Sequence, residues 1–108
     1  MRRGELWTAA ADTHYASKPR PVLVVQDDRF DATDSITICP LTTDPTEIPL
    51  LRIGLDPESG RGLAQPSSIM VDKLTTTPRS KLGQHVGKVS DTDMLTLARA
   101  LVVFLGLA

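Results

Sequence analysis

This 108-residue chain lacks several features that would assign it at once to a class of proteins. It has one cysteine, Cys39, so a scaffold held by internal disulfides is excluded. Aromatic residues make up only 4% of the chain, and the net charge is −1. The overall charge therefore gives no general case for a nucleic acid partner. With 108 residues the chain can bury about two-thirds of its unfolded surface, so we expect a single domain, 1–108, with one core.

Long apolar runs are also missing. The basic start Met1–Arg3 is followed by Gly4 and Glu5, where a secretory segment would need apolar residues, and the apolar tail 100–108 is too short to cross a bilayer. We therefore expect a cytoplasmic protein without a membrane partner. Cys39 stands among apolar residues, which favours a buried thiol in a reducing compartment over a reactive one.

Charge is distributed unevenly along the chain. Residues 1–25 carry a net charge of +2, residues 26–58 carry −6, residues 59–90 carry +4, and the remainder carries −1. If the first and third segments meet in the fold, they form a basic face beside an acidic one, which would suit a polyanion. A mixed, solvated surface is the alternative.

Most of the chain has strand patterns. Residues 21–26 form a nearly continuous apolar run, which predicts a strand covered on both faces, and Pro49 places the strand 48–55 at a sheet edge. An acidic, turn-rich loop follows at 27–34, and a hydroxyl-rich turn begins at Thr42. The expected strands cover residues 4–10, 21–26, 35–41, 48–55, 67–72 and 84–89.

The end of the chain has a helical pattern instead. Ser90 with Asp93 three residues later is typical of a capping box, and apolar residues then recur at helical spacing until Gly106. We expect one amphipathic helix of about four turns. The fold class is therefore mainly β with a C-terminal helix (α+β). The apolar face of the helix could pack on the sheet, seal a dimer or anchor to a membrane, and the first use is favoured.

Arg20 lies between Pro19 and Pro21 at the entrance of the 21–26 strand. Two prolines stiffen the backbone and remove two amide donors, so the guanidinium is carried on a rigid, extended segment. This arrangement indicates a cation aimed at a ligand. A proline pair at a sheet corner with a merely solvated arginine is the alternative.

These features occur in an order that resembles a known family. The chain opens with Arg-Gly-Glu-Leu-Trp, continues with Arg-Pro-Val-Leu-Val-Val and Ile-Cys-Pro-Leu-Thr-Thr, and ends in a capped helix. In this it resembles the MazF/PemK family of toxin endoribonucleases over nearly its whole length. The resemblance implies a small twisted SH3-like barrel of the CcdB/PemK type, and a homodimer that cuts single-stranded RNA without a metal or other cofactor. It also implies inhibition by a cognate antitoxin protein, through an acidic segment laid over the basic face.

The resemblance also assigns site residues. Arg20 matches the family's catalytic arginine, Thr42 matches its catalytic threonine, and His14 sits where some members have a loop histidine. Asp72 falls where related chains have an acidic residue linked to catalysis or RNA contact. Two positions differ from the family, because Met70 stands where one branch has arginine and Lys73 replaces a common glutamine, so an RNA sequence preference does not transfer.

The chemistry of these side chains suggests their roles. Arg20 stays charged at every accessible pH, so it suits electrostatic stabilisation of a phosphorane better than proton donation. Thr42 can orient the phosphate, and His14 either gives acid–base help or is simply solvated. Asp72 could accept a proton, bind a base edge or serve only as a turn residue.

RNA binding is expected from a few further polar groups. Lys18 and Lys73 would meet phosphates, and Thr43 and Asp72 complete the expected contacts. Because Trp7 and Tyr15 are the only visible stacking candidates, base readout would depend on polar groups in loops. Two rivals stay open at this point: a non-catalytic CcdB-like toxin that binds DNA gyrase through its C-terminal helix, and an inactive module that only binds its partner.

Overall fold

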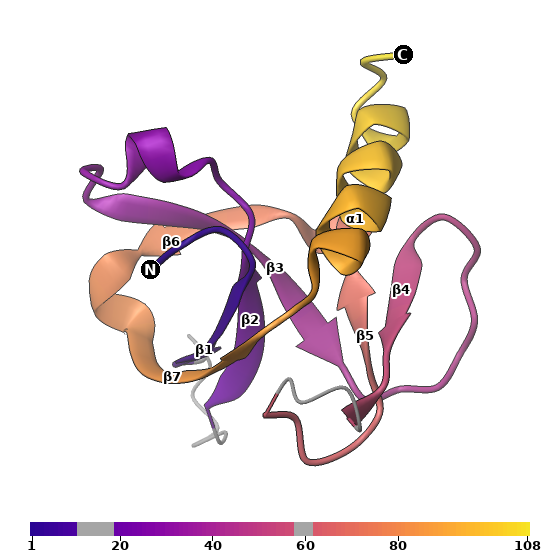
Figure 1. Ribbon diagram of the computed structural model, residues 1–108, viewed down its shortest axis with the longest axis horizontal. Helices are drawn as coiled ribbons and strands as arrows, with labels where there is room; N and C mark the ends of the chain where they lie inside the picture. Colours follow the sequence, from indigo (N-terminus) through magenta and orange to yellow (C-terminus); the bar gives the residue numbers. More distant parts are fainter. Residues whose placement is uncertain (11–18, 58–61) are drawn as a thin grey trace.

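The computed structural model describes residues 1–10, 19–57 and 62–108 (Figure 1). All strand pairs are antiparallel, and the main sheet has the order β4-β5-β3-β2-β1-β7, with β6 paired to β3 off this path. The prediction of a mainly β chain with one C-terminal helix is confirmed. The elements are β1 Glu5–Ala9, β2 Arg20–Val24, η1 Asp28–Phe30, β3 Ser35–Thr42, β4 Arg52–Leu55, β5 Ser67–Met70, η3 Val71–Lys73, β6 Thr75–Pro78, η4 Arg79–Lys81, β7 Leu82–Lys88 and α1 Asp91–Phe104.

Strand β3 connects two parts of the sheet. One of its edges pairs with β2, while the other pairs first with β6, over Ser35–Ile38, and then with β5, at Leu41 and Thr42. In Figure 1 the strands β6, β3, β2, β1 and β7 curl round on one side, and β5 and β4 extend the sheet towards α1. Thr42 therefore lies where the curled part of the sheet meets β5.

The apolar residues form two cores, one on each face of β2 and β3. Leu23 points into the larger core with α1, while Val22 and Val24 point into the smaller one. This confirms the prediction that the 21–26 run is covered on both faces. The larger core contains Leu6, Leu23, Val25, Cys39, Leu41, Leu55, Ile69, Val71, Val89 and Leu97, and the smaller one Val22, Val24, Ile36, Ile38 and Leu82.

Helix α1 begins as the sequence predicts. The Asp93 N–H donates to Ser90 Oγ (3.0 Å), and the Ser90 N–H donates to Asp93 Oδ2 (3.3 Å), which completes the capping box. Leu97 is fully buried against the sheet, but Val103, Phe104 and Leu105 are exposed where the helix extends beyond the strands in Figure 1. Core packing therefore accounts for the apolar stripe from Met94 to Leu101 but not for its C-terminal end.

Three elements differ from the sequence expectation. The 67–72 strand ends at Met70, and Val71–Lys73, which include Asp72, form the short helix η3. The 48–55 strand is limited to β4, because Ile48 accepts hydrogen bonds from Leu51 N and Arg52 N in a turn where Leu50 has φ +70°. Strand β4 is still the terminal strand of the main sheet path, so the edge position is confirmed. Strand β6 was missed because its sequence, Thr-Thr-Thr-Pro, has no apolar alternation.

The Cys39 thiol should be chemically inert in the folded protein. It is fully buried in the larger core, and burial raises its pKa to about 11, with the Asp72 carboxylate adding to the rise. Because the thiolate is the reacting form, we expect alkylation by iodoacetamide at pH 8 to be about a hundredfold slower than in urea-unfolded protein. Mass spectrometry of timed samples measures this, and equal rates in the two states would contradict the burial argument.

Removing the helix cap should weaken the fold. Ser90→Ala leaves the Asp93 N–H without its acceptor, and we expect a loss of about 1 kcal/mol in the free energy of unfolding. Urea denaturation followed by circular dichroism measures the change. Ser80→Ala, an exposed serine in η4, is the matched control and should change stability by less than about 0.5 kcal/mol.

Candidate functional site

The register of the sheet brings Arg20 and Thr42 to corresponding positions on adjacent strands. The observed β2–β3 pairs are Val22 with Pro40, Leu23 with Cys39 and Val24 with Ile38. Continuing this register by two residues puts Arg20, the first residue of β2, opposite Thr42, the last residue of β3. Side chains opposite each other in an antiparallel pair lie on the same face. Two residues 22 positions apart in the sequence therefore belong to one surface.

Arg20 is an exposed cation. Its backbone pairs with Ala9 of β1, and no carboxylate in the described part of the chain forms an ion pair with its guanidinium. As far as the described residues go, the N–H groups of the planar head can be offered to an anion.

The Thr42 hydroxyl is oriented by the turn that follows β3. The Asp44 N–H donates to Thr42 Oγ1 at 3.1 Å, so the oxygen acts as an acceptor towards the backbone. Its own hydrogen is left to donate outwards, and the residue is half-buried. Asp44 is itself fixed, since its Oδ1 accepts from the Thr46 N–H (2.9 Å) and the Thr46 hydroxyl (2.7 Å). A hydroxyl held in this way suits donation to a phosphate oxygen.

The other expected site residues differ in how far the structure describes them. His14 and Lys18 lie outside the described residues. Thr43 is exposed and borders two pockets next to Thr42. Lys73 is exposed in η3, with its Nζ 3.7 Å from Asp72 Oδ2. The exposed Thr43 and Lys73 are thus accessible to a ligand from solvent.

Asp72 is engaged by a residue that the sequence analysis did not select. Arg52 Nη1 lies 2.5 Å from Asp72 Oδ1, and both side chains are largely buried. The hydrogen bond from Arg52, together with its charge, lowers the pKa of Asp72. In the sequence Arg52 appears as an ordinary charged residue on an edge strand, and no spacing rule links it to a carboxylate 20 positions later.

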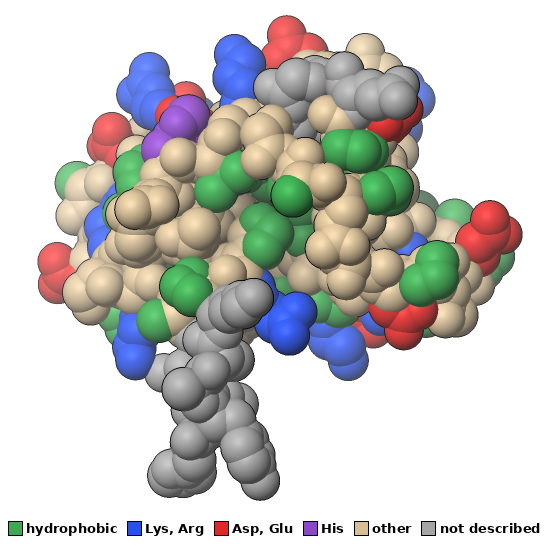
Figure 2. Space-filling view, turned by 90° about the horizontal axis from the view of Figure 1, so that it is seen from below, with side chains coloured by type: hydrophobic (Ala, Val, Ile, Leu, Met, Phe, Trp, Pro, Cys, Tyr) green, Lys and Arg blue, Asp and Glu red, His purple; other side chains and the backbone are tan. Residues whose placement is uncertain are grey.

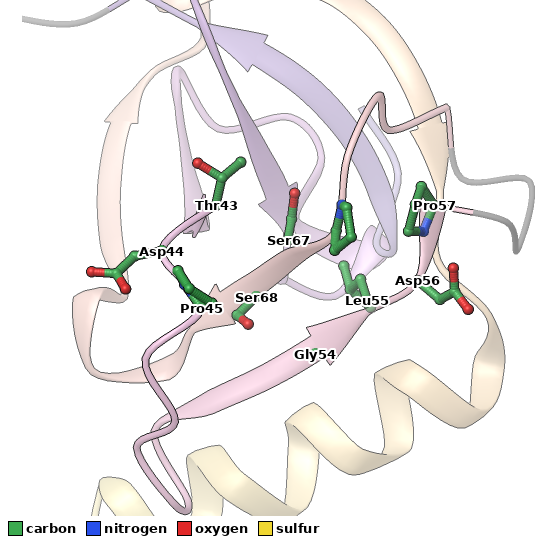
Figure 3. Close-up of a pocket in the computed structure, with 10 residues that line it drawn as sticks. Thr43, Asp44, Pro45, Gly54, Leu55, Asp56, Pro57, Ser67 and Ser68 are labelled. Atoms are coloured by element: carbon green, nitrogen blue, oxygen red, sulfur yellow. The ribbon is translucent and has the colours of Figure 1, made fainter.

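Two hollows flank Thr42. The smaller, of about 200 Å³, is lined by Thr42, Asp44, Thr46, Ile48, Arg52 and Met70. The larger, of about 500 Å³, lies between the segment after β3 and the facing ends of β4 and β5 (Figure 3). Neither lysine nor arginine is among its described lining residues, so it suits an uncharged group better than an anion. Those residues are Thr43, Asp44, Pro45, Gly54, Leu55, Asp56, Pro57, Pro66, Ser67 and Ser68.

On the face of the molecule where β2 begins and β3 ends, the visible charged groups lie mainly around the rim (Figure 1, Figure 2). Figure 2 shows apolar side chains in the middle of this face and charged ones around its rim. The first and third charge segments do meet, through the β1–β7 pairing. However, Arg2 lies 3.7 Å from Asp28 and the Arg3 N–H donates to the same carboxylate, so at that end the basic segment is partly neutralised by the acidic one.

The second histidine of the chain is held away from Thr42. His85 lies on β7, three strands from β3 in the sheet, with its ring edge-on to Trp7 and its Nε2 3.4 Å from Glu5 Oε2.

Among the described residues, no group of three or more His, Cys, Asp or Glu side chains is placed to hold a metal ion. None of the described helices is long and apolar enough to cross a membrane.

Comparison with known proteins shows the family of the chain. The family described as "PemK-like, MazF-like toxin of type II toxin-antitoxin system" matches residues 2–105. The chain is 56% identical to "Probable endoribonuclease MazF" of Mycolicibacterium smegmatis over 108 residues, covering 100% of this chain and 99% of the relative.

Solved structures show the same fold. The toxin MazF-mt6 of Mycobacterium tuberculosis superimposes with a TM-score of 0.81 at 26% identity, covering 96% of this chain and 98% of that one. A mycobacterial endoribonuclease solved in complex with its cognate antitoxin gives 0.77 at 24% identity, covering 100% and 95%. The similarity spans the Arg20 and Thr42 strands as well as the C-terminal helix. The chain therefore belongs to the PemK-like, MazF-like family of toxins of type II toxin–antitoxin systems.

Proposed function

We propose that this chain is the toxin of a toxin–antitoxin pair and acts as an endoribonuclease on single-stranded RNA, without a metal. The observation that supports the proposal is the β2–β3 register, which, continued two residues beyond the observed pairs, aligns Arg20 with Thr42 on one face of the sheet. A guanidinium without a carboxylate partner among the described residues, beside an oriented hydroxyl, is a suitable pair of donors for a phosphodiester. The endoribonuclease named among its relatives shares more than half of its residues.

The reaction uses the RNA's own 2′-hydroxyl as nucleophile. Its oxygen attacks the adjacent phosphorus, the bond to the 5′-oxygen breaks, and the products are a cyclic phosphate and a 5′-hydroxyl. The 2′-oxygen loses one proton and the departing oxygen gains one. Arg20 stabilises the charge that develops on the non-bridging oxygens, and Thr42 orients the phosphate by donating its hydroxyl hydrogen. His14 is proposed to help with proton transfer, because histidine is the one residue type among the candidates whose unperturbed pKa lies close to neutrality.

The substrate is held by groups around this pair. We assign RNA contacts to Lys18, Thr43, Asp72 and Lys73, of which Lys18 and Lys73 would bind phosphates. The 500 Å³ pocket beside Thr43 is open to a base or ribose next to the scissile bond. Its apolar surface includes three prolines, and its polar groups are hydroxyls and carboxylates, which can accept from base amino groups.

The CcdB-like alternative, in which the toxin binds DNA gyrase without catalysis, is less well supported. A match to the MazF-like family and a 56% identical relative named as an endoribonuclease favour the nuclease. Arg20 and Thr42 also have no use in a mechanism that depends on the C-terminal helix alone.

Two protein partners complete the proposal. A cognate antitoxin is expected from the family and from the complex formed by a structural neighbour, and it would block RNA by competition.

A second copy of the chain is proposed as the partner that covers the exposed apolar surface of α1 and the 48–51 turn. Leu50 and Val103, exposed by 69% and 57%, border two shallow hollows of about 290 and 320 Å³ on this surface. Burial of such a surface is a common basis of homodimers.

Removing either donor should abolish cleavage without unfolding the protein. Arg20→Ala and Thr42→Ala are each expected to lower the cleavage rate of a labelled RNA about a hundredfold or more, in buffer containing EDTA. Arg29→Ala and Thr92→Ala change the same residue types at exposed positions on η1 and α1, and should cleave at the wild-type rate. Cleavage by Arg20→Ala at the wild-type rate, or loss of wild-type activity in EDTA, would refute the mechanism.

A charge placed in the α1 surface should separate the dimer. Val103→Asp is expected to give a monomer in sedimentation equilibrium at micromolar concentration, because a carboxylate there cannot be buried against a second copy. Phe30→Asp alters an equally exposed apolar residue in η1 and should remain dimeric. A wild-type monomer, or a dimeric Val103→Asp, would exclude this surface.

A further inference from the structure

Arg52 is a second arginine on the face that carries Arg20 and Thr42. Side chains alternate along a strand, and Leu41, Leu55 and Ile69 point into the larger core. The intervening positions, which include Thr42 and Arg52, therefore point to the opposite side. Consistently, Thr42 and Arg52 line the same 200 Å³ hollow. The hollow thus contains a hydroxyl that has been assigned to the reaction and a guanidinium that has not.

We propose that Arg52 binds a phosphate of the RNA backbone next to the scissile one, and that Asp72 is the residue that positions it. This inference rests on the proposed function. Asp72, one of the expected RNA contacts, contributes to RNA binding through Arg52, because its Oδ1 holds the guanidinium in place.

The guanidinium is held from one end only. Nη1 donates to Leu51 O (2.9 Å) and to Asp72 Oδ1 (2.5 Å), which uses both of its hydrogens. Within the described residues, Nε and Nη2 make no hydrogen bond, so three N–H groups remain available. An ion pair serving only to hold β4 against η3 would gain most from the parallel, two-nitrogen geometry, which is absent here. The open edge of the guanidinium is therefore free to bind a second anion.

The burial of the pair favours a preformed contact. The side chains of Arg52 and Asp72 are 15% and 21% exposed, against 59% for Lys73. An arginine already fixed in this way loses little conformational freedom when it binds, whereas the exposed lysine must be ordered first. Asp44 is the opposing charge at the same hollow. Hydrogen bonds from Thr46, and then the charge of Arg52, lower the pKa of Asp44, so this carboxylate keeps its negative charge and a phosphate has to bind nearer to Thr42 and Arg52 than to Asp44.

The sheet geometry assigns Arg52 to a different phosphate from Arg20. Arg20 is next to Thr42, but Arg52 is two strands away through β5 and offset by two residues, since Thr42 pairs with Ser68 and Arg52 with Met70. These steps correspond to about 10 Å across the strands and about 7 Å along them. Arg52 thus suits binding and alignment of the strand rather than stabilisation of the reacting phosphate.

A binding assay separates this role from a structural one. The probe is a fluorescent single-stranded RNA carrying 2′-O-methyl groups, which cannot be cleaved, and its Kd is measured by anisotropy at several KCl concentrations. Arg52→Gln is expected to raise Kd about tenfold and to reduce the slope of log Kd against log salt by about 0.7, as for one lost phosphate contact. Arg52→Lys should keep the slope and lose part of the affinity. Asp72→Asn should raise Kd while keeping the slope.

The controls make each outcome decisive. Arg29→Gln removes an exposed arginine of η1 and should bind with the wild-type slope and Kd, apart from a small change due to net charge. A folded Arg52→Gln with the wild-type slope and Kd overturns the inference. If Arg52→Gln does not fold, Asp72→Asn and Arg52→Lys decide, and wild-type Kd in both overturns it.

The cleavage assay separates this inference from the proposed function. Wild-type cleavage that is lost in Arg20→Ala, together with unaltered binding by Arg52→Gln, rejects only the role of Arg52. A wild-type protein that neither binds nor cuts RNA rejects both.

Discussion

The pairing of β3 along both of its edges is the constraint on which the site depends. β2 on one edge and β5 on the other meet this strand at its C-terminal end. The backbone hydrogen bonds of an antiparallel ladder fix the register, and a slip of one residue would turn every side chain to the opposite face. With this register, Arg20 arrives from one side of Thr42 and Arg52 from the other.

The two cores make that register rigid. Both β2 and β3 bury side chains on both faces. A slip of one residue would therefore turn residues such as Leu23 and Cys39 out of the larger core, and residues such as Val22 and Ile38 out of the smaller one. Helix α1 completes the larger core through Leu97 and also contacts η3, the short helix that carries Asp72. The helix therefore supports the far side of the site without contributing a reacting group to it. Its exposed C-terminal end, from Val103 onwards, is left for another protein surface.

The arginines of this chain divide into groups with and without an intramolecular partner. Arg2 and Arg29 pair with carboxylates of the 27–28 segment at the exposed surface, where such pairs stabilise the fold little. Arg52 is held by a largely buried carboxylate but at one end only, and Arg20 has no described carboxylate partner. A site for a polyanion requires cations that the protein has not already neutralised. The overall charge of −1 gives no sign of them.

The sequence by itself determined the capping box at Ser90, the apolar run of β2, the buried Cys39 and, through its motifs, the family. These follow from local patterns, which depend on neighbours a few positions away. Arg20 and Thr42 as site residues stay a prediction from the sequence motifs. The pairing of Arg52 with Asp72, the limits of β4, the Thr-rich strand β6 and the exposed end of α1 were decided only by the tertiary structure. The limit of β4 depends on the turn that begins at Ile48, and the exposed end of α1 depends on where packing against the larger core stops. The Arg52–Asp72 pair and the β3–β6 pairing arise from contacts between residues distant in sequence, and neither periodicity nor composition carries information about such contacts.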